Sequence, residues 1–401
     1  MPEGVVIIGG GQAGGVAAAS LREQGYAGTI TLIAEEPCLP YQRPPLSKNY
    51  LAGQMSAQQV LLKQAAFYGE KAISVMTGVC AESIDRSSRA VRTSDARSIG
   101  YDTLLLATGA RPRRIDLPGA SLSGVCYLRT LADVDDIRSR MSAAKRMVII
   151  GGGYIGLEAA AVARETGLHV TVLEGAERIL GRVTGQTIAD FVAAAHRSHG
   201  VDIQCGVRVN AFTGTARVEG VACAHAQFPA DLVVVGIGVQ PNSELAANAG
   251  LKTDNGICVD EHCRTEDARI YAAGDCTNHP NGLIGRRLRL ESVQNAVDQA
   301  RAAAANICGV AKPYRELPWF WSNQYDLRLQ MAGLSLGHDR TLIRGDAARP
   351  GFSVLYARGD VVIAADTVNA PREHLALRKL IAQGSPIDVD RLRDPANTLP
   401  V

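Results

Sequence analysis

The chain has 401 residues, of which 46% are hydrophobic and 20% are charged, and its formal net charge is +2. This composition is typical of a globular protein with two or three domains, and the near-neutral charge argues against general affinity for nucleic acid. A core strand begins by Val5, and no apolar run approaches the ~20 residues of a membrane span. We therefore expect a cytoplasmic protein with no signal peptide and no membrane partner.

A strand that runs into a glycine-rich turn opens the chain. Residues 5–8 are apolar, and Gly9, Gly11 and Gly14 follow with the spacing Gly-x-Gly-x-x-Gly. In a Rossmann fold the first glycine permits a tight turn, and the second lets the backbone approach a pyrophosphate. The third lets the next helix pack closely against the sheet. The opening residues therefore predict a dinucleotide site at the N-terminus of a helix.

The next apolar run supports this prediction. Residues 30–33 form a second strand at the distance expected for a βαβ unit, and Glu35 and Glu36 follow it. A carboxylate at this place can accept a hydrogen bond from an adenosine ribose hydroxyl. We therefore include both glutamates in the first dinucleotide site.

Residues 39–48 form a loop stiffened by consecutive prolines. From composition alone it is either a rigid surface crossover or a support that holds Arg43 and Lys48 against a cofactor. Together with the first fingerprint, this loop resembles the FAD-dependent ferredoxin reductases of bacterial oxygenase systems, which include putidaredoxin reductase and the reductases of aromatic-ring dioxygenases. The resemblance covers essentially the whole chain, and it implies that Arg43, Pro44 and Lys48 lie along the isoalloxazine of FAD.

Two elements follow before the chain leaves the first nucleotide domain. Residues 57–68 are predicted to be helical, and residues 101–106 form an apolar strand that ends in Ala107, Thr108 and Gly109. Such small residues let the backbone pass close to a bound dinucleotide. By resemblance, this is the FAD-side strand after which the chain crosses into an inserted domain.

The fingerprint then occurs a second time. An apolar run at residues 147–150 leads into Gly151, Gly153 and Gly156, with Tyr154 and Ile155 between the last two glycines. Two such motifs in one chain predict one flavin and one nicotinamide dinucleotide, with electron transfer between them. Glu158 follows in the predicted helix, either as a carboxylate favourable to the helix N-terminus or, by resemblance, as the partner of Lys48 where nicotinamide meets flavin.

Glu174 ends the second strand of this repeat, at residues 169–173. Its carboxylate can accept hydrogen bonds from a ribose and would repel a 2′-phosphate, which favours NADH over NADPH. Arg178 and Arg182 lie near enough in sequence to soften this preference, and we include Arg182 among the nicotinamide-site residues. Gly238, in the segment that leads back to the first domain, completes that site.

The returning chain supplies the rest of the expected FAD site. A strand ends in Gly274 and Asp275, which by resemblance admit and bind the ribityl chain. An alanine-rich helix is predicted over residues 291–307, and its first residues, Glu291, Ser292 and Val293, match the family element beneath the flavin ring.

The last segment, from about residue 317, contains both tryptophans of the chain. By resemblance, Trp319 lies at the cofactors and joins Lys48 and Glu158 as a catalytic residue. Alternating runs at residues 327–333, 351–358 and 361–369 predict an antiparallel sheet, and residues 371–383 predict a helix after it.

The predicted fold is therefore α/β, with two Rossmann-like domains and a C-terminal α+β domain. We expect an FAD-binding domain of residues 1–110 and 240–316, split by an NAD-binding domain of residues 111–239. The C-terminal domain is expected over residues 317–401.

The predicted function is a flavoprotein reductase that passes electrons from NADH through FAD to a [2Fe–2S] ferredoxin, which supplies an oxygenase such as those of aromatic hydrocarbon catabolism. Arg286, Arg287 and Arg289 are candidates for docking this acidic partner, although they fit a solvated loop equally well. The protein is expected to be a monomer or a homodimer.

Other functions on the same scaffold remain open: rubredoxin reductase, NADH oxidase or peroxidase, and a non-enzymatic binding protein like apoptosis-inducing factor. A disulfide reductase is disfavoured because residues 43–48 contain no cysteine pair. A peroxidase needs a single cysteine at that place, and Cys38, the only one near, precedes the loop. The nine cysteines include no Cys-x-x-Cys motif, so we expect reduced thiols and no metal site.

Overall fold

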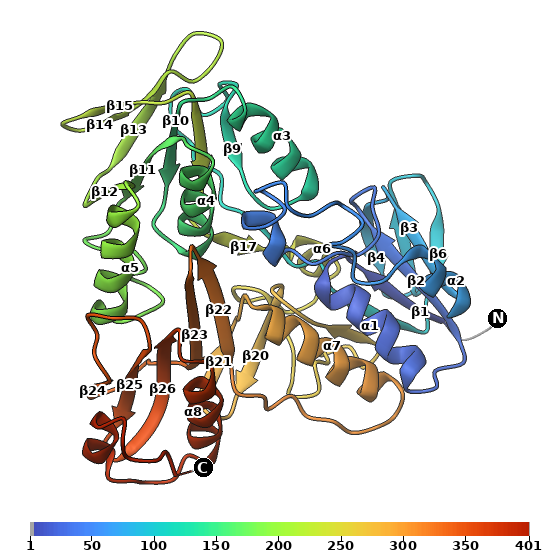
Figure 1. Cartoon of the computed structure of the whole chain (residues 1–401). Helices are drawn as coiled ribbons and strands as arrows, with labels where there is room; N and C mark the ends of the chain where they lie inside the picture. The colour runs from blue at the N-terminus through green and yellow to red at the C-terminus, as the bar shows by residue number, and fades with distance from the viewer. Residues whose placement is uncertain (1–3, 401) are drawn as a thin grey trace. The chain divides into compact units, whose positions relative to one another are not determined.

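The computed structural model describes residues 4–400, which form two compact units. Of the described residues, the first unit contains 4–43, 57–111 and 239–318, and the second contains 44–56, 112–238 and 319–400. Each unit therefore gathers segments that are far apart in the sequence, as the colours of Figure 1 show. The second unit takes in a short stretch, residues 44–56, from the middle of an N-terminal segment that otherwise belongs to the first.

The first unit is built on a parallel sheet in the order β3-β2-β1-β7-β19. Valine, isoleucine and leucine fill its central strands because both faces are covered. The strands of this sheet are β1 (Gly4–Ile8), β2 (Thr29–Ala34), β3 (Ile73–Thr77), β7 (Thr103–Leu106) and β19 (Ile270–Ala272).

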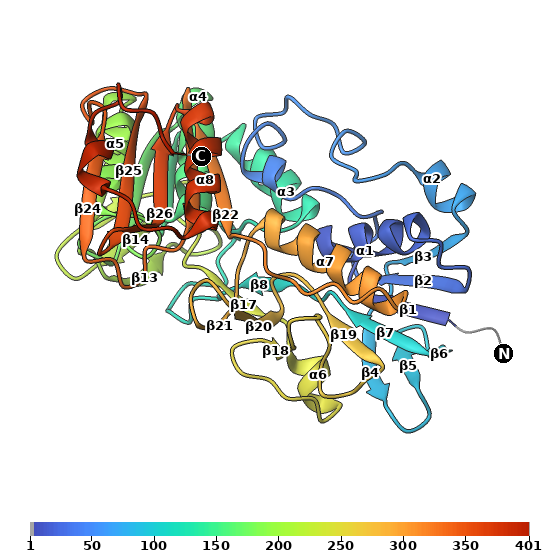
Figure 2. The same ribbon diagram turned by 90° about the horizontal axis from the view of Figure 1, so that it is seen from below.

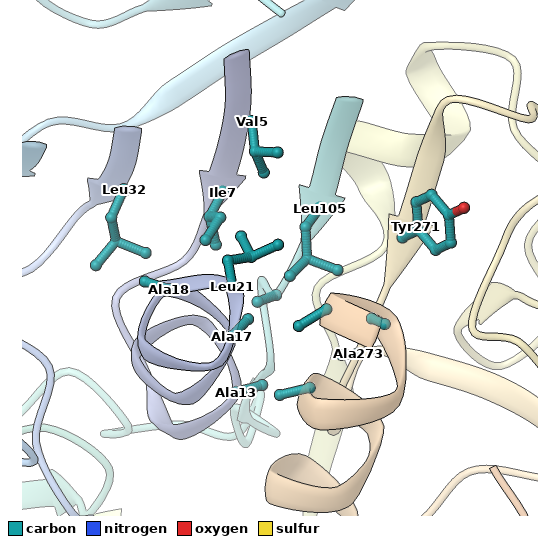
Figure 3. Packing of buried hydrophobic residues seen from close by; sticks show 14 of the residues in the cluster. Val5, Ile7, Ala13, Ala17, Ala18, Leu21, Leu32, Leu105, Tyr271 and Ala273 are labelled. Carbon is teal, nitrogen blue, oxygen red and sulfur yellow. The ribbon is translucent and has the colours of Figure 1, made fainter. Parts of the chain in front are cut away.

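Two alanine-rich helices, α1 (Gln12–Glu23) and α7 (Val293–Ile307), lie side by side on one face of this sheet (Figure 2). Their small side chains let the helices pack closely, and Ile7, Leu21 and Leu105 fill the space between them and the strands (Figure 3). This packing brings the N-terminus of α1 to the carboxyl edge of the sheet, where doubly wound proteins bind their ligands.

Short elements complete the first unit. An antiparallel sheet is formed by β4 (Ala81–Asp85), β5 (Ala90–Thr93) and β6 (Ser98–Gly100). The remaining elements are α2 (Ala65–Glu70), β8 (Ala110–Pro112), β17 (Val239–Pro241), α6 (Glu244–Asn248), β18 (Ile257–Cys258), β20 (Thr277–Asn281) and β21 (Arg286–Leu288).

The second unit contains another parallel sheet, in the order β12-β11-β10-β16-β9, and an antiparallel sheet in the order β22-β23-β26-β25-β24. Helix α4 packs on β11 and also on β22, so one helix joins the two sheets (Figure 1). The elements of the parallel sheet region are η1 (Pro44–Ser47), β9 (Val125–Tyr127), α3 (Leu131–Met141), β10 (Arg146–Ile150), α4 (Tyr154–Glu165), β11 (His169–Glu174), α5 (Gln186–Ser198), β12 (Asp202–Cys205) and β16 (Leu232–Val235). A small antiparallel sheet is formed by β13 (Val209–Thr213), β14 (Gly220–Cys223) and β15 (Gln227–Pro229).

The last segment has the antiparallel sheet and C-terminal helix that its alternating pattern predicts. Gly384, at φ 62°, ends that helix in the left-handed conformation that glycine adopts readily. The elements are β22 (Trp319–Gln324), β23 (Leu327–Gly333), β24 (Arg340–Arg344), β25 (Phe352–Arg358), β26 (Val361–Val368), α8 (Pro371–Gln383) and η2 (Val389–Arg393). The α/β class with an α+β C-terminal part is confirmed.

Three sequence expectations about helices were wrong in detail. The helix expected over residues 57–68 is only α2, because residues 60–62 instead pair their backbone with residues 40–42. Helix α7 begins at Val293, since Ser292 is its N-cap and accepts a hydrogen bond from the Asn295 amide. Helix α4 begins at Tyr154, so Glu158 lies beyond its first turn.

Among residues 4–400, no helix is long and apolar enough to cross a membrane. The same part of the chain shows no group of three or more His, Cys, Asp or Glu side chains placed to hold a metal ion.

Candidate dinucleotide sites

The glycine turn of the first fingerprint packs against the end of β7. Gly9 has φ +120°, and a Cβ there would lie 2.1 Å from the carbonyl oxygen of Ala107. A Cβ on Gly14 would lie 1.9 Å from the Gly9 carbonyl oxygen. Glycine is therefore required at both positions, for the tight turn and for the approach of helix to strand.

Gly11 differs from both, because a Cβ there would meet no heavy atom within 4 Å. It faces open space at the N-terminus of α1, and the buried Oε1 of the next residue, Gln12, has no hydrogen-bond partner within residues 4–400. Free backbone amides at a helix N-terminus and a buried orphan oxygen fit a polar ligand at this place. The pyrophosphate of a dinucleotide therefore fits this cradle.

Two more of the expected flavin-site elements reach the same place in the first unit. A Cβ on Gly274 would lie 3.1 Å from Cβ of Ala13 in α1 and 3.8 Å from Cβ of Ala296 in α7. The end of β19, with Asp275 next to Gly274, and the start of α7 therefore lie at the first fingerprint. Glu291 lies outside α7 and pairs with Arg289, at 2.6 Å.

Asn242 holds the end of β7. The hydroxyl of Thr108 donates to its carbonyl oxygen at 2.6 Å, and its amide donates to the Thr108 carbonyl at 2.9 Å. The backbone amide of Asn242 also donates to the Gly109 carbonyl. Thr108 and Gly109, which the sequence places beside a dinucleotide, are thereby held by the segment that follows β17.

Side chains of the stiff loop bind the carboxylate of Glu36, which follows β2. Glu36 accepts a hydrogen bond from Tyr41 at 2.6 Å and pairs with Arg43 at 2.7 Å, whereas Glu35 is exposed. The structure therefore joins Glu36 to Arg43, a contact that the sequence reasoning did not foresee. An Oε1–guanidinium pair leaves lone pairs free for a ribose hydroxyl.

The second fingerprint repeats this geometry in the second unit. Gly151 has φ +105°, and a Cβ there would lie 2.4 Å from the Gly236 carbonyl oxygen. A Cβ on Gly156 would lie 2.3 Å from the Gly151 carbonyl oxygen, whereas Gly153 has no heavy atom within 4 Å of such a Cβ. The second cradle therefore also leaves room for a pyrophosphate.

Glu174, the last residue of β11, is fixed by the loops around it. Its two carboxylate oxygens accept hydrogen bonds from the Gly152 amide at 2.6 Å and the Ala176 amide at 2.8 Å. A Cβ on Gly238 would lie 3.5 Å from the Arg182 guanidinium, so Arg182 is at the rim of this site. Ile155 is 42% exposed, which leaves an apolar side chain free at the start of α4.

A buried charge cluster lies on α4 in the same unit. Lys48 pairs with Glu158 at 2.6 Å, and the Glu158 side chain is only 4% exposed. Glu158 Oε2 also accepts the Ser47 hydroxyl, while its Oε1 accepts the Ser322 hydroxyl at 2.6 Å. The carboxylate is therefore buried and multiply bonded, and it lies beyond the first turn of α4, where the charge of the helix N-terminus has little effect.

The structure brings Lys48 and Glu158 together. Trp319 lies three residues before Ser322 on β22, so the two side chains are on opposite faces of the strand. Trp319 packs against Trp321, and the Arg378 guanidinium lies 4.8 Å from its ring centre. Ser322, which reaches Glu158 from the same strand, and Ser47 were missed by the sequence reasoning. The signal for Ser47 was its position next to Lys48; Ser322 had none beyond the aromatic run before it.

A second buried carboxylate ties the loop after Leu180 to the C-terminal sheet. Asp366 accepts hydrogen bonds from Thr184 and from Tyr356 at 2.8 Å. Burial raises the pKa of Asp366 to about 6. Burial also raises the pKa of Tyr154 in the second fingerprint, and the charge of Asp366 adds to this effect. The loop that carries Arg182 is thus anchored from β26.

Two of the three candidate docking arginines have bonds within the first unit. Arg287 donates to the Val259 carbonyl at 2.7 Å and to the Asn278 carbonyl, and Arg289 pairs with Glu291. Arg286 is exposed.

The sequence matches two protein families and is similar to several known proteins. Residues 3–300 match the pyridine nucleotide-disulphide oxidoreductase family, and residues 319–400 match the reductase C-terminal family. The chain is 46% identical to the rhodocoxin reductase of Rhodococcus erythropolis, over 97% of this chain and 92% of that protein.

Two solved structures are similar throughout. The ferredoxin reductase of the CYP199A2 system from Rhodopseudomonas palustris is 42% identical with a TM-score of 0.97, covering 99% of this chain and 98% of that one. A covalent putidaredoxin reductase–putidaredoxin complex matches with 44% identity and a TM-score of 0.96, covering 99% and 97%.

Proposed function

This chain belongs to the pyridine nucleotide-disulphide oxidoreductase family, and we propose that it passes electrons from NADH through FAD to a [2Fe–2S] ferredoxin that supplies an oxygenase. It is an FAD-dependent oxidoreductase that uses NAD(P)H. When bound, FAD accepts a hydride from the reduced nicotinamide and can release electrons one at a time. The names of the similar proteins support a ferredoxin as acceptor.

The observation that carries the proposal is the buried Lys48–Glu158 pair. Lys48 comes from residues 43–48 of the stiff loop, where a disulfide reductase needs a cysteine pair, and these residues contain no cysteine. Cys38 offers little alternative, because burial and the nearby Glu36 raise the pKa of its thiol. The chain is therefore suited to pass electrons on without a protein disulfide.

Each fingerprint has its proposed cofactor. The first unit holds FAD through Gly9, Gly11, Gly14, Glu36, Arg43 and Asp275, and the second holds NADH through Gly151, Gly153, Gly156 and Glu174. Glu174 supports NADH over NADPH, because a fixed carboxylate repels a 2′-phosphate. The roles of Pro44, Lys48 and Trp319 beside the flavin stay predictions.

The remaining proposals concern the surroundings of the protein. All nine cysteines are free within residues 4–400, which supports a reducing compartment such as the cytoplasm. Of the three candidate docking arginines, Arg286 is the one that we retain as a contact for an acidic partner.

The test is anaerobic stopped-flow mixing of the yellow protein with NADH or NADPH, followed by a [2Fe–2S] ferredoxin, a rubredoxin, oxygen or peroxide as acceptor. We expect bleaching by NADH and the fastest reoxidation by the ferredoxin. Glu158→Gln should slow bleaching at least about tenfold, because it removes the charge that holds Lys48. The control is Glu177→Gln, an exposed glutamate of the same unit. Faster reoxidation by peroxide, or no bleaching by either nucleotide, would overturn the proposal.

A further inference from the structure

A line of buried polar side chains continues from Glu158 into the interior of the second unit. Glu158 Oε1 lies 2.6 Å from the Ser322 hydroxyl, and that hydroxyl lies 3.0 Å from the Gln324 amide nitrogen. The Gln324 amide oxygen lies 2.8 Å from Nε2 of His196. Four residues from α4, β22 and α5 are therefore joined in series.

The chemistry of the groups sets the direction of this line. A carboxylate can only accept, so the Ser322 hydroxyl donates to Glu158 and accepts from the Gln324 amide nitrogen. The Gln324 oxygen, which can only accept, then requires a proton on Nε2 of His196. Every donor therefore points toward the Glu158 carboxylate.

The line is shielded from water. Ser322 and His196 are 0% exposed, and Gln324 is 1% exposed. Ser322 and Gln324 are two residues apart on β22, so they lie on one face of the strand, which packs on α4. Burial lowers the pKa of His196 to about 4, which keeps its ring neutral near pH 7 and leaves Nδ1 without a proton. Within residues 4–400, Nδ1 has no hydrogen-bond partner, as this tautomer allows.

We propose that Ser322 is a positioning residue for the nicotinamide reaction, and that Gln324 and His196 hold its hydroxyl proton on Glu158. The two carboxylate oxygens are then held from opposite sides, because Oε2 takes Ser47 and Lys48 while Oε1 takes Ser322. A carboxylate so held cannot rotate, and the Lys48 ammonium is fixed with it. This inference rests on the proposed function and adds three residues that the sequence did not indicate.

The first test needs no turnover. Nitrogen-15 NMR of histidine in the oxidised protein reports which ring nitrogen carries the proton, and His196→Gln identifies the signal. We expect the Nε2–H tautomer. The Nδ1–H tautomer would overturn the proposal, because Gln324 would then be reversed and Ser322 would donate away from Glu158.

The second test is the rate of flavin reduction by NADH under anaerobic conditions. Ser322→Ala should lower the limiting rate about tenfold with less than about a twofold change in the dissociation constant of NADH. Ser322→Thr, which restores the hydroxyl, should recover the rate to within about twofold. The matched control is Ser353→Ala, since Ser353 is also 0% exposed in the C-terminal sheet and donates to a glutamate, Glu373.

The third test asks whether the line acts as a unit. Gln324→Met should slow reduction about threefold, and the Ser322→Ala, Gln324→Met double variant should be no slower than Ser322→Ala, because the line is already cut. Multiplied effects would show that Gln324 acts independently and would overturn its role. If Ser322→Ala does not retain flavin, Ser322→Cys, a weaker donor of similar size, replaces it in both tests.

The outcomes separate the two proposals. A wild-type protein that NADH does not reduce contradicts the proposed function. A wild-type protein that NADH reduces normally, with Ser322→Ala indistinguishable from Ser353→Ala, contradicts only the positioning role.

Discussion

The two dinucleotide fingerprints share a backbone but differ in how their carboxylate is held. Ile8 pairs with Ile33 in the first sheet, and Ile150 pairs with Leu173 in the second, so Ala34 stands in the first repeat where Glu174 stands in the second. Glu174 therefore reaches the glycine turn directly and accepts the Gly152 amide.

In the first repeat the acid comes later in the chain, and side chains support it. Glu36 is bound by Tyr41 and Arg43 from the stiff loop rather than by the glycine turn. The second site thus depends mainly on its own backbone, whereas the first depends on a loop that the fingerprint does not contain. The same motif can therefore produce an autonomous site in one place and a supported site in another.

The largest expected effect tests whether the two sites are separate. Gly9→Ala and Gly151→Ala both force a Cβ at positive φ against a carbonyl oxygen, at 2.1 and 2.4 Å. We expect Gly9→Ala to lose the flavin, and Gly151→Ala to stay yellow but no longer bleach with NADH. The flavin-to-protein absorbance ratio and stopped-flow bleaching measure the two outcomes.

The control for this pair is Gly69→Ala, an exposed position in α2 with no heavy atom within 4 Å of a Cβ. Flavin loss from Gly151→Ala alone would show that the sites are not separate.

The second prediction compares the acid sensitivity of the two units. Burial lowers the pKa of His279 in the first unit, and of His196 and His374 in the second, to about 4. In the unfolded chain these histidines bind a proton near pH 6.5, whereas in the folded protein they stay neutral down to about pH 4. The free energy of unfolding is therefore highest above pH 6.5 and falls as the pH is lowered toward 4. Each histidine should remove about 2 kcal/mol from the free energy of unfolding between pH 7 and pH 5.

Urea unfolding at the two pH values measures this loss. His279→Phe and His374→Phe keep an aromatic ring against Tyr314 and Trp319 but cannot ionise, so each should flatten the pH dependence. Asp366, whose raised pKa stabilises the folded state on acidification, opposes the loss in the second unit, and Asp366→Asn should steepen it. An unchanged pH dependence in all three variants would contradict the prediction.

The smallest effect concerns the carboxylates themselves. Glu174→Gln should reduce the preference for NADH over NADPH about tenfold and leave the flavin content unchanged, because it removes the repulsion of a 2′-phosphate. Glu36→Gln should instead weaken flavin retention about tenfold, since it releases Arg43 from its ion pair. Flavin titration of the apoprotein and nucleotide-dependent bleaching distinguish the two. If both variants changed flavin retention and nucleotide preference alike, the proposed difference between the two sites would be contradicted.

The sequence by itself determined the elements that follow from local patterns. Both fingerprints, with Glu174 after the second, could be predicted because glycine spacing and the apolar strand before it are contiguous in the chain. The strands over residues 327–333 and 352–358 and the helix ending at Gly384 follow from alternation and a glycine stop. The start of α7 was misplaced because a serine before a helix can be its cap or its first residue.

Only the tertiary structure decided how the supporting contacts are made. Lys48 and Glu158 are 110 residues apart, and Ser322 is 164 residues from Glu158, so no local pattern relates them. A serine carries no periodic signal, and its partner depends on how β22 packs against α4. Each glycine fingerprint lies within one short stretch of sequence, whereas the buried hydrogen bonds that hold Glu158 form only where distant segments meet.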